Sequence, residues 1–227
     1  MAEDLDPARR RSGAGRWVPA RRYGSILCLL LAVWIAAPCG GCWGAVDIDE
    51  RAFVLMIGVD RHEQGVRVTI QVAVNEAMAA EGGGGGGDKR AFVVAQQDDR
   101  TTGAALHRLQ ESISMPVYYG QLKVVVFGEE LARDPGITDP MTAFTRESEI
   151  RGQVWVAVAR GRAEDIVAAG IAGERLPAAY VERLLNTGRT YGHTPDSRLS
   201  IVAAQLASLQ QQPLLPMLSR KGETVAI

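Results

Sequence analysis

The chain has 227 residues and a formal net charge of −1 at neutral pH, with 47% hydrophobic and 22% charged residues. This balance excludes a disordered chain, a collagen-like chain and a membrane protein with many spans. Aromatic residues make up 6% of the chain and basic residues are not in excess. Both features argue against nucleic acid as a partner, because its binding needs a cationic surface or stacking rings.

The N-terminal segment has the composition of an export signal. Residues 1–25 contain six arginines and no lysine, and the uncharged run Ile26–Pro38 follows. This run is shorter than the roughly 20 residues that a helix needs to cross a bilayer. We therefore predict a signal peptide, and the alternative is an N-terminal anchor that stays in place.

Cys42 is the candidate lipidation site. It follows Gly40-Gly41, and small residues directly before a cysteine resemble a bacterial lipobox, in which the thiol is lipidated and the peptide is cut just before it. We therefore predict a lipoprotein signal peptide at residues 1–41 and a linker at residues 42–50. Cleavage there removes Cys28 and Cys39 and leaves no free thiol. The alternative is an ordinary signal peptide followed by an incidental cysteine.

Two hydrophobic patterns after the linker predict a β-hairpin. Phe53–Asp60 is nearly all apolar, as in a strand that is buried on both faces. Val66–Val74 alternates strictly, which predicts a half-buried strand whose second face carries Arg67, Thr69, Gln71 and Ala73. The short link between the two segments favours antiparallel pairing.

A run of six glycines, Gly82–Gly87, follows the hairpin. A phosphate-binding loop would end in Gly-Lys and then Ser or Thr at the start of a helix. Here the run ends in Asp88-Lys89-Arg90 and precedes a predicted strand. We therefore interpret it as a flexible loop insertion.

The rest of the chain alternates between helices and strands. We expect strands at residues 91–96, 122–127 and 153–159, and the start of another at 224–227. We expect a helix from Thr101 or Thr102 to Ser114 and further helices at residues 137–144, 163–169, 178–185 and 201–209. Residues 51–227 are thus predicted to form an α+β domain with helices packed on a mixed β-sheet of about five strands.

The sequence contains no pattern that is typical of a catalytic or metal site. His62, His107 and His193 have no second His or Cys at metal-ligand spacing. Glu129-Glu130 after a strand is typical of a helix start, and a carboxylate pair for hydrolysis is the alternative. We therefore predict a protein that is not an enzyme and has no metal or cofactor.

Charged residues are concentrated between one predicted helix and the next strand, in Arg146-Glu147-Ser148-Glu149-Ile150-Arg151. As a solvated loop, this cluster would contain local ion pairs that each contribute less than about 1 kcal/mol. As the rim of an interface, it would bind a partner. The candidate interface residues are Arg146, Glu147, Glu149 and Arg151.

Several segments in sequence order point to one family. They are Gly41–Trp43, Asp49–Ala52, Ile57–Asp60, Tyr118–Glu130, Arg146, Glu149–Arg151, Val154–Ala163 and Pro213–Pro216. Together they resemble the spore-germination receptor C-subunit lipoproteins, the Ger(x)C family. The chain departs from that pattern at Gly44, where the family usually has Asp, and at Gln121, where His is common.

The resemblance implies a lipoprotein on the outer face of the inner spore membrane, which assembles with integral membrane subunits into a nutrient germinant receptor. It also implies that residues 51–227 are the N-terminal domain of a longer protein whose C-terminal domains are absent here. Because a protein partner is implied, the charge cluster gains weight as an interface. The alternative function is a lipid-anchored solute-binding protein of an envelope transport system, which would need two lobes around a cleft.

Overall fold

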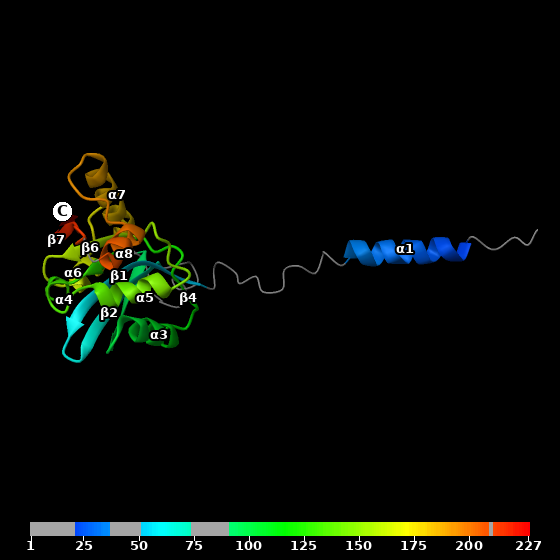
Figure 1. Ribbon diagram of the computed structural model, residues 1–227, viewed down its shortest axis with the longest axis horizontal. Coiled ribbons are helices and arrows are strands. Elements are labelled where there is room, and N and C mark those ends of the chain that lie inside the picture. Colours follow the sequence, from blue (N-terminus) through cyan, green and yellow to red (C-terminus); the bar gives the residue numbers. More distant parts are fainter. Residues whose placement is uncertain (1–20, 37–50, 74–90, 209–210) are drawn as a thin grey trace, which may run out of the picture. The chain divides into compact units, whose positions relative to one another are not determined.

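The computed structural model describes residues 21–36, 51–73, 91–208 and 211–227 (Figure 1). It divides into two compact units, Met1–Val46 and Asp47–Ile227. The described part of the first unit is helix α1, Arg21–Ala36, which covers most of the apolar run of the predicted signal. Among the described residues, no helix combines the length and the hydropathy that a bilayer crossing requires. Cys42 and Gly82–Gly87 lie outside the described residues.

The second unit is built on a mixed sheet in which β1 is a central strand. The sheet has eight strands in the order β3-β2-β1-β5-β6-β7-β8, and β4 pairs with the start of β1. The strands are β1 (Ala52–His62), β2 (Gly65–Ala73), β3 (Phe92–Asp99), β4 (Val117–Tyr118), β5 (Val124–Phe127), β6 (Trp155–Ala159), β7 (Met217–Lys221) and β8 (Thr224–Ala226). The predicted antiparallel hairpin is confirmed as β1–β2, whereas β1, β5, β6 and β7 run parallel.

Helices cover both faces of this sheet, and Figure 1 shows α5 and α8 in front of the strands. Leu109, Phe144 and Val202 belong to the hydrophobic core on one face, and Ile166, Val181 and Leu185 to the core on the other. The helices are α3 (Thr102–Ser112), α4 (Glu129–Arg133), α5 (Thr138–Arg146), α6 (Ala163–Val167), α7 (Pro177–Thr190) and α8 (Leu199–Ala207). The predicted α+β class is therefore confirmed.

Two details of the predicted sheet were wrong. Strand β2 is not half-buried, because Thr69 and Gln71 on its second face are 0% exposed. Helices α6 and α7 cover that face, which the alternating pattern of β2 could not reveal. The sheet also has more strands than expected, because β4 and β7 have only two and five residues and are too short to give a clear period. The predicted strand start at residues 224–227 is confirmed as β8.

A β-bulge in β1 lets this strand contribute to both cores. The pairing with β2 shifts register between Val54 and Met56, so Leu55 and Met56 both pack with α6 and α7. Further along, Gly58 faces α6, and a Cβ on it would lie 2.9 Å from Val167 and 3.1 Å from Ala163. Glycine at this position therefore allows α6 to pack closely against the strand.

Gln71 joins β2 to the two helices that cover it. Its side-chain amide donates a hydrogen bond to the carbonyl of Val167 at 2.8 Å, and its side-chain oxygen accepts one from the amide N–H of Ala178 at 3.2 Å. These groups stand at the last residue of α6 and in the first turn of α7. Gln71 thus satisfies two buried helix-end groups that have no intrahelical partner.

Replacement of Gln71 by Leu is expected to lower the free energy of unfolding by about 2–4 kcal/mol, because two buried backbone groups would lose their partners. Urea denaturation followed by circular dichroism measures the change. The control is Gln96→Leu in the exposed part of β3, which should change stability by less than about 0.5 kcal/mol. Equal effects of the two substitutions would show that the Gln71 hydrogen bonds do not stabilise the fold.

Candidate functional site

The charge cluster at residues 146–151 does not form one continuous surface. Arg146 is the last residue of α5 and is exposed, and Arg151 is also exposed. Between them, Ile150 is 9% exposed and belongs to the hydrophobic core. The cluster therefore follows a turn that includes a buried side chain, and its charged residues are interrupted by the core.

Glu149 has a structural role within this cluster. Its carboxylate accepts a hydrogen bond from the amide N–H of Tyr119 at 3.0 Å, which fixes the segment between β4 and β5. Tyr119 is 4% exposed, and its hydroxyl has no hydrogen-bond partner among the described residues. Burial, together with the nearby carboxylates of Glu147 and Glu149, raises the pKa of Tyr119 above its ordinary value. This ring is thus a neutral core residue.

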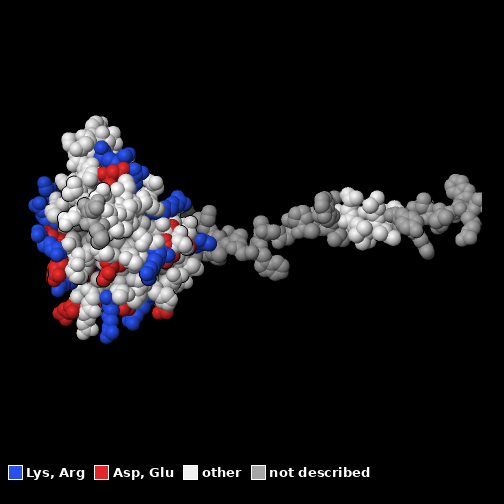
Figure 2. Space-filling view, viewed as in Figure 1, with Lys and Arg blue, Asp and Glu red and all other residues white. Residues whose placement is uncertain are grey.

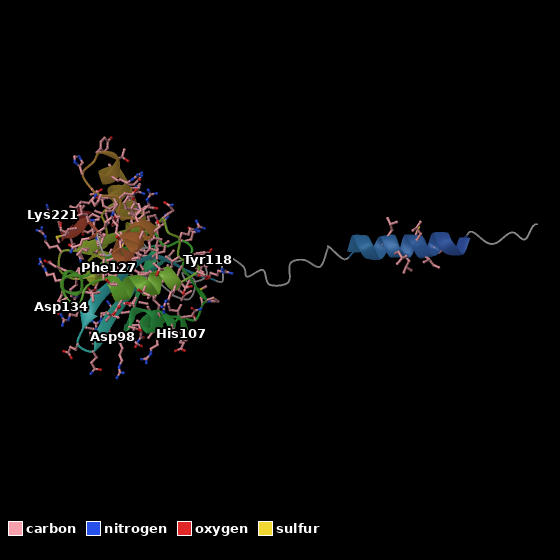
Figure 3. The ribbon with its side chains drawn as sticks, viewed as in Figure 1. Asp98, His107, Tyr118, Phe127, Asp134 and Lys221 are labelled. Atoms are coloured by element: carbon pink, nitrogen blue, oxygen red, sulfur yellow. The ribbon has the colours of Figure 1, made fainter. Side chains whose placement is uncertain are left out.

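Arg146 and Glu147 line a groove with a volume of about 940 Å³. Its walls are formed by the β1–β2 turn, the start of α3, the segment between α4 and α5, and α5 itself. Figure 3 places Asp134, on the α4–α5 side of this region, far from Tyr118 beside the start of β1. Glu149 and Arg151 do not line the groove, so the structure brings together only half of the predicted interface residues.

The N-terminus of α3 forms one wall of the groove. The Thr101 side chain, one of the two caps that the sequence predicted, accepts a hydrogen bond from the amide N–H of Ala104 at 3.2 Å. Thr102 and Gly103 lie between these two residues, and neither of their amide N–H groups has a partner in the described part of the chain. This helix start therefore presents free donors and the positive end of its dipole to the groove.

The arginines of the groove differ in their pairing. Arg61 donates to Asp134 at 2.9 Å and lies 3.7 Å from Glu130. Arg100 and Arg146 have no carboxylate within ion-pair distance among the described residues. Residues Arg61, Arg100 and the start of α3 were not in the predicted site. Arg100 stands directly before the helix cap, and this is the one signal that the sequence offered.

A second charged pocket, of about 380 Å³, lies at the carboxyl ends of β1, β5 and β6. Asp60, which is 6% exposed, accepts hydrogen bonds from the amides of Ala163 at 2.6 Å and Glu164 at 2.9 Å. Burial raises the pKa of Asp60 above its ordinary value, against the opposing effect of these two donors. The carboxylate therefore caps α6 from a distant strand.

The carboxylate of Glu129, in the same pocket, is also hydrogen-bonded to groups of the protein. It accepts hydrogen bonds from Arg133 at 2.8 Å and from the amide of Gly161 at 3.0 Å. The Arg133 guanidinium, followed by this amide, lowers the pKa of Glu129. Glu129 and Glu130 begin α4, which confirms their interpretation as a helix start.

The three histidines lie apart from one another. His62 is 3.4 Å from Asp98, His107 is 3.6 Å from Glu111, and the His193 ring stacks on Tyr191. In the described residues, no group of three or more His, Cys, Asp or Glu side chains is placed to hold a metal ion.

Figure 2 shows that Lys, Arg, Asp and Glu are interspersed on the visible face of the second unit.

Comparisons with known proteins agree on one family. The model of the spore germination protein N-terminal domain matches residues 44–220. The chain is 27% identical to the putative spore germination protein YfkR of Bacillus subtilis over 201 residues, which are 87% of this chain and 50% of that protein. It is 27% identical to spore germination protein KC of Bacillus subtilis, over 83% of this chain and 47% of that protein.

A further relative is spore germination protein GerQC of Bacillus cereus, which is 24% identical over 56% of this chain and 35% of its own length. The chain spans about half the length, or less, of these curated relatives. No solved structure gives a significant match.

The hydrogen bonds of Asp60 can be tested by substitution with Asn. One of the two α6 amides would then face an NH₂ group, which cannot accept a hydrogen bond, so the free energy of unfolding should fall by about 1–3 kcal/mol. The matched control is Asp139→Asn in the first turn of α5, where the side chain is exposed and unpaired in the described structure. Thermal unfolding that is equally affected by both would contradict the capping role.

Because Glu149 has a structural role and Arg151 is exposed, the two residues should contribute differently to the free energy of unfolding. Glu149→Ala should destabilise the protein by about 1–2 kcal/mol, because the buried amide of Tyr119 loses its acceptor. Arg151→Ala, on the exposed side of the same turn, should change stability by less than about 0.5 kcal/mol. Urea unfolding of both variants measures the difference, and similar values would mean that the cluster behaves as a solvated loop throughout.

Proposed function

Because the chain belongs to the family of the spore germination protein N-terminal domain, we propose that it is a lipid-anchored subunit of a nutrient germinant receptor. It acts in spore germination by assembling with integral membrane subunits, on the outer face of the inner spore membrane. The family match over residues 44–220 is the observation that carries this proposal. That match begins two residues after Cys42, the candidate site of the lipid.

A lipid on Cys42 would supply the membrane attachment. The described helices of the second unit contribute their apolar side chains to the two cores. One acyl chain binds a bilayer only marginally, whereas two or more chains hold a protein firmly. A diacylated Cys42 would therefore keep the second unit close to the membrane, since residues 43–50 can span at most about 30 Å.

The described polar groups agree better with a role in assembly than with catalysis. Asp60 and Glu129, two carboxylates of the second charged pocket, are held by backbone amides and Arg133. The solute-binding alternative would place its ligand in a cleft between two lobes. The described part of the second unit is instead a single sheet with helices on both faces, which favours a module that binds other proteins.

The anchor is tested by Cys42→Ala in the full chain, expressed in spores. The variant should leave the membrane pellet or persist as an unprocessed precursor, because neither lipid attachment nor the usual cut can occur. Nutrient-triggered germination, followed as the loss of optical density, should weaken through lost localisation while the fold stays intact.

The control is Cys28→Ala, which alters a cysteine inside the apolar run and should leave processing and membrane attachment unchanged. Cys42→Ala protein that still fractionates with membranes at its mature size would show that the anchor lies elsewhere. A deletion strain that germinates normally in every nutrient would contradict the receptor function itself.

A further inference from the structure

Arg100, Arg146 and the N-terminus of α3 line the same groove, and none of them has a counter-ion among the described residues. Each is positive or is a hydrogen-bond donor. Because the groove holds about 940 Å³, it has room for several residues of another chain. These positive groups and donors are therefore available to bind an acidic group of another chain.

The hydroxyl of Thr102 is a further unpaired polar group at the same wall. Thr102 lines the groove and is 3% exposed, yet its hydroxyl oxygen has no hydrogen-bond partner in the described part of the chain. A buried polar group without a partner costs free energy, and such groups are rare in folded proteins. A carboxylate seated here could accept hydrogen bonds from the hydroxyl and from the free amides of Thr102 and Gly103.

Carboxylates also line the groove, from Glu63, Asp134, Asp139 and Glu147. Asp139 lines it from the first turn of α5, and its carboxylate has no ion pair within the described structure. Asp139 and Arg146 are seven residues apart on one face of α5, which corresponds to about 10 Å along the helix. An extended chain covers about 10 Å in three residues.

We propose that this groove docks an extended segment of a partner receptor subunit, which carries a carboxylate and, about three residues away, a cation. The carboxylate binds at the start of α3 between Arg100 and Arg146, and the cation binds at Asp139. This inference rests on the proposed function, because it takes the partner to be a protein of the receptor. It moves the interface away from Glu149 and Arg151 and into the groove.

Charge reversal tests the proposal in the full lipidated chain. Detergent-solubilised spore membranes are used to co-purify the integral membrane subunits with the wild type, with Arg100→Glu/Arg146→Glu and with Arg151→Glu. The double variant should recover at least ten times less of those subunits. Arg151→Glu changes another exposed arginine of the same cluster, outside the groove, and its recovery should stay within twofold of the wild type.

The outcomes separate the two proposals. If the wild type co-purifies and the double variant co-purifies equally well, the groove is not the interface and the receptor function stands. If the wild type recovers no membrane subunit, the receptor function fails and this inference fails with it. Equal losses in the double variant and in Arg151→Glu would indicate nonspecific electrostatics and would also overturn the groove.

A second measurement does not need the partner or the double variant. The ¹⁵N-labelled full chain in detergent is titrated with sodium acetate, a minimal carboxylate, and separately with sodium chloride at equal ionic strength. The amide signals of Thr102 and Gly103 should shift with acetate more than with chloride, and Thr102→Val should reduce the effect. Equal shifts with both salts would overturn the carboxylate seat.

Discussion

Strand β1 has to be buried on both faces, and most of the second unit is arranged to meet that requirement. In the sheet, β1 lies between β2, to which it is antiparallel, and β5, to which it is parallel. The bulge after Val54 turns Leu55 and Met56 toward α6 and α7, while Ile57 and Val59 face the core that contains Phe144. A strand with this much apolar surface gains stability only when helices cover both sides.

Polar side chains of the sheet then position the helices that cover it. Asp60 binds the start of α6, and Gln71 binds the end of α6 and the start of α7. Gly58 lets α6 approach β1, so one short helix is held by contacts from two neighbouring strands. Because α6 has only five residues, it depends on these contacts rather than on its own propensity.

The parts of the fold that repeat a pattern could be predicted from the sequence, and the parts that depend on neighbours could not. The apolar run 53–60 and the alternation of 66–74 specified the hairpin, and Thr101 specified the start of α3. The burial of Thr69 and Gln71 depends on helices about 100 residues further along the chain. Ala178 of α7, for example, is 107 residues from Gln71. No local period carries such information.

The candidate site was also mispredicted in part, because it depends on contacts between residues that are distant in sequence. Sequence proximity grouped Arg146 with Glu149 and Arg151, but Glu149 accepts a hydrogen bond from the amide of Tyr119, 30 residues away, and is only partly exposed. Arg146 instead shares a groove with Arg100, because Gly103 at the start of α3 packs near Ala143 of α5, one turn before Arg146. Charges that are adjacent in sequence thus separate, and charges that are distant in sequence meet. An interface in this domain is therefore set by which helices the sheet brings together, more than by the local density of charge.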